Sequence, residues 1–161
     1  MTAARFLALP LRPWTGPDGA VSPTASLWDD GMLIGHPDID RDHRTLFAII
    51  RRVDELAATE ASVDAVSEVL CQLADYSREH FAREENLMRL SRFPRCTEHV
   101  VEHYKFIRKL TVLVDIFERG RPDVIPECRA FLGDWFVGHI SLDDMEFGAH
   151  LRAIAASHAP A

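Results

Sequence analysis

From about residue 40 onward, apolar side chains recur at spacings of three and four residues, the period of a helix that buries one face. Four stretches share this pattern, over about residues 40–58, 62–90, 99–117 and 123–139, the last continuing further. Ser62 is a typical N-cap, and the breaks at 91–94 and 120–122 contain proline or glycine. Because the connections are short, each helix must run back alongside the one before it. The pattern therefore predicts an all-α fold, an antiparallel up-down four-helix bundle.

The beginning of the chain differs from the rest. Residues 1–27 contain four of the nine prolines and show no helical period. We therefore expect an irregular N-terminal arm over residues 1–27, the bundle over 28–155 and a short C-terminal tail over 156–161.

The helical stripes are not purely apolar. Side chains that can bind metals replace core residues in all four stripes: His43, His80 with Glu84, His99 with His103, and His139. Two residues four positions apart lie on one face of a helix, so each pair can converge on one site. In an antiparallel bundle, positions early in the first and third helices lie level with positions late in the second and fourth. We therefore expect these residues to meet in one buried layer, where unpaired polar groups would be costly.

Each residue taken alone has a simpler interpretation. A single inward histidine is more often a hydrogen-bonded core residue than a ligand, and paired histidines occur by chance on solvated faces. Five histidines and a carboxylate at one level favour a metal site instead. One tetrahedral zinc would leave several of these ligands unused, so two metal ions are the economical interpretation; spacing does not choose among iron, manganese, cobalt and zinc. We expect surface roles in the entry loop and the C-terminal tail for the remaining histidines, His36, His150 and His158.

Composition and charge narrow the class of protein. The chain has 161 residues and a formal net charge of −7, without a dense basic patch, which argues against nucleic acid or an anionic membrane as a partner. Its apolar runs are far shorter than the roughly 20 residues of a membrane span, and the apolar patch before Pro10 is too short for a signal peptide. Cys71, Cys96 and Cys128 lie far apart, so we interpret them as reduced packing residues. These features predict a soluble cytoplasmic protein.

Four fragments together resemble the hemerythrins, in particular the bacterial single-domain members: GHPDIDRDHRTLF from Gly35 to Phe47, DYSREHFAREENLM from Asp75 to Met88, His99 and His103 with Phe106, and WFVGHISLDD from Trp135 to Asp144. The resemblance covers about residues 28–147. It implies a non-haem centre of two iron ions, oxo- or hydroxo-bridged, with five histidine ligands and two bridging carboxylates, which reversibly binds O2.

The resemblance also implies a role for each ligand. Carried over by motif position, the saturated iron is held by His99, His103 and His139, the iron with the open site by His43 and His80, and the bridges are Glu84 and Asp144. On an unbroken helix, however, a step of five residues rotates about 140°, so Asp144 would face away from His139, whereas Asp143 would not. We follow the family in choosing Asp144. This choice predicts that the helix deforms or stops between His139 and Asp144.

The resemblance favours an O2-binding protein for transport, storage or delivery over an enzyme. The walls expected around the layer are mostly bulky and apolar and offer no obvious acid: Phe47, Phe81, Phe106, Trp135, Phe136 and Ile140. The alternatives are a di-iron oxidoreductase acting on peroxide or nitric oxide, and an O2 or redox sensor. A sensor ranks last, because sensory members usually carry a signalling module for which these residues leave no room. The identity of any protein recipient is left open, and a monomer is favoured.

Two residues depart from the family pattern. Asp42 stands where glutamine usually precedes the first ligand histidine, and Phe147 stands where many members have tyrosine. Both substitutions could alter the hydrogen bonds that support the ligands.

Overall fold

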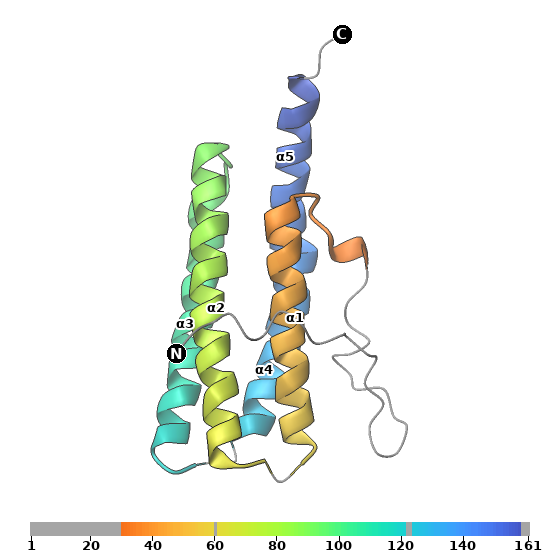
Figure 1. Ribbon diagram of the computed structural model, residues 1–161. Coiled ribbons are helices and arrows are strands. Elements are labelled where there is room, and N and C mark those ends of the chain that lie inside the picture. Colours follow the sequence, from red (N-terminus) through yellow and green to blue (C-terminus); the bar gives the residue numbers. More distant parts are fainter. Residues whose placement is uncertain (1–29, 60, 122–123, 159–161) are drawn as a thin grey trace.

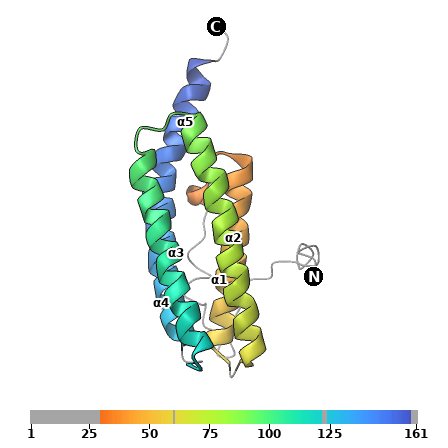
Figure 2. The ribbon, with the colours of Figure 1, turned by 90° about the vertical axis from the view of Figure 1, so that its left-hand side faces the viewer.

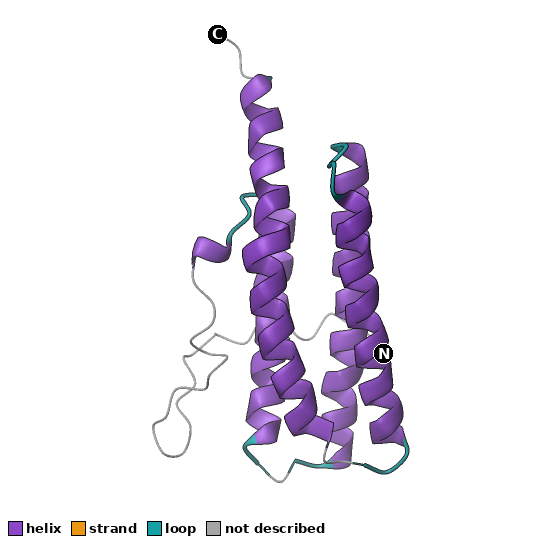
Figure 3. Ribbon diagram, turned by 180° about the vertical axis from the view of Figure 1, so that it is seen from behind, coloured by secondary structure: helices purple, strands orange, loops and turns teal. Residues whose placement is uncertain are grey.

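The computed structural model describes residues 30–59, 61–121 and 124–158, so the expected N-terminal arm lies outside the described residues. Within these ranges the chain forms helices joined by short loops and turns, with no strand (Figure 3). The elements are η2 (Asp30–Met32), α1 (Pro37–Ala57), α2 (Val63–Leu90), α3 (Cys96–Glu118), α4 (Val124–His139), η3 (Ile140–Asp144) and α5 (Met145–Ser157). None of the described helices is long and apolar enough to cross a membrane. The predicted all-α bundle is confirmed.

Neighbouring helices in the bundle are antiparallel (Figures 1 and 2). Helix α1 packs against α2 and α4, and α3 packs against the same two helices, so the bundle closes as a ring in chain order. The segments α4, η3 and α5 follow one another without a loop and together form the fourth helix. Its last part, α5, extends beyond the other helices at the top of Figure 1. We call this end, which contains the loop between α2 and α3 and the start of α1, the upper end of the bundle.

Two helix starts show how the sequence sets the boundaries. The side-chain oxygen of Ser62 accepts a hydrogen bond from the backbone N–H of Ala65, so the predicted cap of α2 is confirmed. Helix α1 begins at Pro37, three residues before the predicted start at Asp40. Proline suits a first helical position because its missing N–H has no partner there in any helix.

The chain just before α1 is held onto the bundle by polar contacts. The Asp40 carboxylate accepts hydrogen bonds from the backbone N–H groups of Ile34 (2.8 Å) and Gly35 (3.2 Å). Gly35 has a φ of +89°, a conformation that side chains with a Cβ rarely adopt. From α5, Arg152 donates to the Ile34 carbonyl oxygen at 2.8 Å. The entry segment is therefore fixed between the first turn of α1 and α5.

The buried apolar side chains form two clusters. The larger cluster fills the bundle below the polar layer and contains Leu46, Leu73, Phe106, Leu113 and Leu132 among others. The smaller cluster closes the upper end and consists of Ile34, Ile39, Met88, Phe93 and Phe147. A layer of buried histidines and carboxylates lies between the two clusters, because along each helix these residues separate members of one cluster from members of the other.

Candidate metal centre

The seven residues expected at the metal site lie on five successive elements. The structure places His43 on α1, His80 and Glu84 on α2, His99 and His103 on α3, His139 at the end of α4 and Asp144 at the end of η3. Each of them is at most 4% exposed. The antiparallel order of the helices brings all seven to one level near the upper end, so their inward faces meet.

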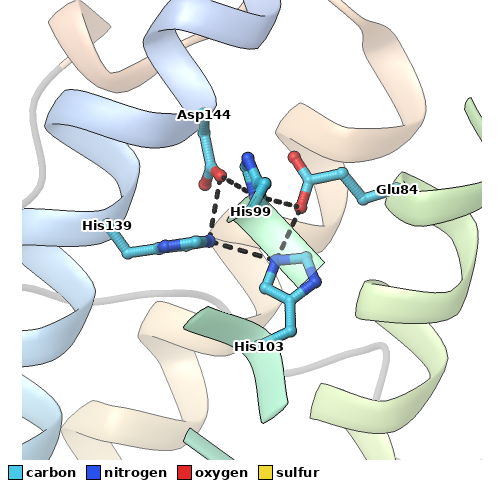
Figure 4. Close-up of side chains that lie close together, drawn as sticks. All are labelled: Glu84, His99, His103, His139 and Asp144. Atoms are coloured by element: carbon cyan, nitrogen blue, oxygen red, sulfur yellow. Dashed lines mark hydrogen bonds and ion pairs between the residues drawn. The ribbon is translucent and has the colours of Figure 1, made fainter. Parts of the chain in front are cut away.

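Five of these residues form a compact group in Figure 4, which shows Glu84, His99, His103, His139 and Asp144. One nitrogen or oxygen atom from each lies within 4.8 Å of the corresponding atoms of the others. Asp144 Oδ1 lies 3.2 Å from His99 Nε2 and 3.1 Å from His139 Nε2. Glu84 Oε2 lies 3.3 Å from His103 Nε2. The three imidazoles therefore turn their Nε2 atoms toward two carboxylates.

The other two histidines contact the same two carboxylates. His43 Nε2 lies 3.2 Å from Asp144 Oδ2, and His80 Nε2 lies 3.8 Å from Glu84 Oε2. The rings of His43 and His80 lie 5.1 Å apart. Asp144 thus directs Oδ1 toward His99 and His139, in a set of three histidines with His103, and Oδ2 toward His43, in a set of two with His80. Glu84 likewise contacts both sets, through Oε2.

The helix is distorted between His139 and Asp144, as expected from the choice of Asp144 that followed the resemblance. Residues Ile140–Asp144 form a π-helical turn, which takes up one more residue than an α-helical turn. As a result both neighbouring acids contact the same imidazole: Asp144 Oδ1 lies 3.1 Å from His139 Nε2, and Asp143 Oδ2 lies 3.3 Å from His139 Nδ1. Asp144 is fully buried, whereas the Asp143 side chain is 27% exposed. The π turn is what directs the fifth residue after His139 into the layer.

The close packing of carboxylates and imidazoles shifts their proton affinities. Burial alone would lower the pKa of His139, but the carboxylates of Asp144, Asp143 and Glu84 outweigh it and raise this pKa to about 10. His99 behaves in the same way: burial lowers its pKa, and Asp144 and Glu84 raise it to about 9. Burial and mutual repulsion oppose ionisation of Glu84 and Asp144, yet the surrounding imidazoles hold both pKa values below their ordinary range. The layer therefore favours positive charge at its centre.

The donor atoms of this layer fit a bound metal. Within the described residues, several buried atoms have no hydrogen-bond partner: both ring nitrogens of His43, both carboxylate oxygens of Glu84 and of Asp144, and Nε2 of His99. Buried polar atoms without partners are costly, and metal ions at the centre would satisfy them. The set contains imidazole and carboxylate but no thiolate, which suits iron among the metals considered. Cys128 instead lies in the larger apolar cluster.

Aromatic side chains enclose the layer. Phe81 stacks on the His103 ring with a centroid separation of 3.9 Å, and Trp135 stacks on the His139 ring at 4.2 Å. Phe136 packs edge-on against Phe47 at 5.1 Å and lies 6.5 Å from the His43 ring. The predicted aromatic walls are thus present.

The two departures from the family pattern have defined surroundings. Asp42 is buried and accepts hydrogen bonds from Arg83 Nε at 2.7 Å and from the Tyr76 hydroxyl at 3.0 Å, and its Oδ2 lies 3.6 Å from His80 Nδ1. Burial would raise the pKa of Asp42, but these partners lower it to about 2. Phe147 is fully buried and packs on Phe93 in the smaller cluster.

The three remaining histidines lie outside the layer, as predicted, but the placement of His150 was wrong. His150 lies within α5 and not in a tail, because the fourth helix continues to Ser157. It is half-buried, and its Nε2 donates to the Ser91 carbonyl oxygen at 2.9 Å, which ties the loop between α2 and α3 to α5. His36 is the N-cap of α1 and is half-buried, and His158 follows α5 and is exposed.

Two carboxylates that contact the outer ring nitrogens, Nδ1 of His103 and of His139, were not predicted from the sequence. Glu85 Oε1 lies 3.1 Å from His103 Nδ1, and Asp143 occupies the equivalent position beside His139. The signal that could have found them is the doubling of the acids, since Glu85 follows Glu84 directly and Asp143 directly precedes Asp144.

Comparison with known proteins agrees with this geometry. A family model described as "Hemerythrin HHE cation binding domain" matches residues 35–151. The bacteriohemerythrin of Stenotrophomonas maltophilia is 33% identical over 136 residues, which are 82% of this chain and 88% of that protein. The bacteriohemerythrin of Clostridium acetobutylicum is 28% identical over 75% of this chain and 97% of that protein. A crystal structure of a hemerythrin point mutant superposes with a TM-score of 0.67 at 29% identity, covering 71% of this chain and 87% of that one. The chain therefore belongs to the hemerythrin family, whose HHE domain binds a di-iron centre.

Proposed function

We propose that this chain binds O2 reversibly at its di-iron centre and serves in O2 transport, storage or delivery. The observation that carries the proposal is the position of the two buried carboxylates between a set of three histidines and a set of two. Two metal ions held side by side need carboxylates that face both. The proposal includes a cytoplasmic location and a monomeric state, which rest on the sequence alone.

The geometry supports a definite assignment of ligands. We assign one iron to His99, His103 and His139, the other to His43 and His80, and the bridging positions to Glu84 and Asp144. Ferrous ions bound here would supply the electrons on which O2 binding depends. Because the second set contributes one imidazole fewer, we assign O2 binding to the side of His43 and His80.

The walls of the site favour release of O2 over its consumption. Phe47 and Phe136 pack together beside His43, and both are buried. Apolar side chains in this position exclude water and supply no proton, and consumption of O2 needs protons. The walls therefore support a carrier or store of O2 in preference to an oxidase.

The proposal is tested by optical spectroscopy of the iron-loaded protein. Reduced protein under argon is expected to be nearly colourless, to gain a charge-transfer band when O2 is admitted, and to lose it when argon is restored. Oxidation without a reversible oxygenated form would contradict O2 carriage. Sustained turnover of peroxide or nitric oxide would show that the site is catalytic.

The ligand assignment has its own test, which is the iron content of variants. We expect His103→Ala to prevent loading with two irons, because it removes an imidazole from the set of three. Asp144→Ala should lose iron more completely than Asp143→Ala, because only Asp144 directs its oxygens toward both histidine sets. A His103→Ala protein with two irons and an unchanged spectrum would refute the assignment.

A further inference from the structure

Two of the proposed ligand histidines have a carboxylate oxygen within 3.3 Å of each of their ring nitrogens. His103 has Glu84 Oε2 at 3.3 Å from its Nε2 and Glu85 Oε1 at 3.1 Å from its Nδ1. His139 has Asp144 Oδ1 at 3.1 Å from its Nε2 and Asp143 Oδ2 at 3.3 Å from its Nδ1. In both cases the inner and outer acids are consecutive in the sequence.

The doubling of the acids has a geometric reason. Consecutive residues on an α-helix point about 100° apart, so when one acid faces the centre of the bundle its neighbour faces the flank. Glu85 therefore reaches from α2 across to His103 on α3. Asp143 lies four residues after His139 and reaches back one turn to its outer nitrogen, while the π turn directs Asp144 to the inner one.

An outer acceptor decides which nitrogen of an imidazole can bind a metal. The nitrogen that binds must present a lone pair, so the ring proton must lie on the other nitrogen, where a carboxylate can accept it. The same contact fixes the rotation of the ring and makes it a stronger donor. Phe81 and Trp135 already fix the faces of these two rings by stacking. Each ring is thus held on its face by an aromatic side chain and on its edge by an acid.

The two acids are placed for this role. The side chains of Glu85 and Asp143 are about three-quarters buried, at 24% and 27% exposure, so solvent screens their charges only in part. Asp42 differs in degree, because it lies 3.6 Å from His80 Nδ1 and accepts hydrogen bonds from Arg83 and Tyr76, whereas the Arg89 guanidinium lies 3.9 Å from Glu85. Neither His43 Nδ1 nor His139 Nδ1 has a hydrogen-bond partner of good geometry within the described residues, but His139 Nδ1 has the Asp143 carboxylate at 3.3 Å. The close outer acids thus belong to His103 and His139, which we assign to the same iron.

We propose that Glu85 and Asp143 are positioning residues that hold His103 and His139 with Nε2 toward the iron and that add negative charge to that iron's surroundings. The proposal rests on the ligand assignment given above. It predicts two measurable effects of these acids. The acids slow the loss of iron, because the rings stay in the binding orientation, and they lower the midpoint potential, because negative charge favours the more oxidised iron.

The test compares conservative variants of the iron-loaded protein. Glu85→Gln and Asp143→Asn keep a side chain of the same shape with a carbonyl acceptor but remove the charge, whereas Glu85→Ala and Asp143→Ala remove both. The matched control is Glu98→Gln, because Glu98 also stands directly beside a proposed ligand, His99, but is exposed. Far-UV circular dichroism and thermal unfolding report folding, and iron release to excess EDTA and the midpoint potential report the site.

We expect all variants to fold and to take up two irons. Release of iron should be about tenfold faster in each amide variant and faster still in the alanine variants, in line with the roughly 10–100-fold effects of such outer partners. The midpoint potential should move to more positive values in all four, and Glu98→Gln should match the wild type in both measurements.

Three outcomes would decide against the proposal or its basis. Release rates and potentials equal to those of Glu98→Gln would overturn it, as would a lower melting temperature with an unchanged potential, because that result indicates a purely structural role. A wild-type protein that fails to take up two irons would contradict the ligand assignment instead, so the two failures are distinguishable.

Discussion

Ser77 is a single buried polar residue next to the layer of proposed ligands, and its hydroxyl has a cost for stability. It lies one turn before His80 on the buried face of α2 and is 1% exposed. Within the described residues its hydroxyl oxygen has no hydrogen-bond partner. Iron bound in the proposed site would satisfy the unpartnered atoms of Glu84 and Asp144, whereas Ser77 stands outside the proposed ligand set. A buried hydroxyl without a partner costs about 1–3 kcal/mol.

We therefore expect Ser77→Ala to raise the free energy of unfolding by about 1 kcal/mol. Ser67→Ala is the matched control, because Ser67 is exposed on the same helix and reports the helix propensity of alanine alone. Urea denaturation of the iron-loaded proteins measures the difference. A loss of stability in Ser77→Ala would mean that the hydroxyl has a partner, such as a bound water, in the folded protein.

At the scale of one element, the π turn η3 determines which acid reaches the centre. A π turn behaves as an α-helix with one residue added, so the segments on either side keep the faces they would have without it. Leu142, in the middle of the turn, is 71% exposed and makes little contribution to the core. The turn can therefore be shortened or lengthened at this position without removing a buried side chain.

Deletion of Leu142 should give a regular helix in which Asp144 follows His139 by four residues. The two side chains would then point in directions about 40° apart. We expect this protein to load two irons and to release them faster than the wild type, because Asp143 moves one residue closer to His139 along the helix and loses its contact with Nδ1. Insertion of one alanine after Leu142 should turn Asp144 away and prevent loading. Iron content and EDTA release measure both effects. Equal loss of iron in the two variants would argue against this account of the turn.

At the scale of the whole molecule, the upper end is closed by chain segments distant in sequence. The entry segment before α1 lies against α5 so closely that a Cβ on Gly148 would come within 2.6 Å of the Ile34 carbonyl oxygen. Ile34 also belongs to the smaller apolar cluster, which covers the layer of ligands. The cover of the metal centre thus depends on close contact between the two ends of the bundle domain.

Gly148→Ala should therefore lower the free energy of unfolding by about 1–3 kcal/mol, because the methyl group overpacks this contact. Gly138→Ala should raise it by about 0.5–1 kcal/mol, because nothing lies within 4 Å of a Cβ there and alanine favours the helix. Thermal and urea unfolding compare the pair. A stable Gly148→Ala protein would show that the entry segment can move away from α5 without cost.

The charges of the layer predict that rising pH lowers the stability of the metal-free protein but improves the retention of iron by the loaded protein. In the metal-free protein the pKa values of His99 and His139 are raised from 6.5 to about 9 and about 10. A raised pKa contributes stability that is complete below about pH 6.5 and is lost as the pH rises through 9 and 10. We therefore expect the free energy of unfolding of the metal-free protein to fall over this range.

Iron must displace the same protons, so retention of iron should improve as the pH rises from about 6 to about 8. Urea denaturation of the metal-free protein and EDTA release from the loaded protein, each measured across the pH range, test the two trends. Greater stability of the metal-free protein at pH 10 than at pH 6.5 would contradict the assigned charges.

The amino-acid sequence by itself determined the four helices, their antiparallel order and the layer at which five histidines and Glu84 meet. It could do so because helical periodicity is local and because short connections leave one way for each helix to run. The form of the distortion in the fourth helix came only from the tertiary structure: α-helical rotation would have turned Asp144 away from His139, and a π turn brings it back. The contacts of Glu85 with His103, of His150 with Ser91 and of Gly148 with Ile34 were likewise decided there, because each joins elements whose distance and rotation no local pattern encodes.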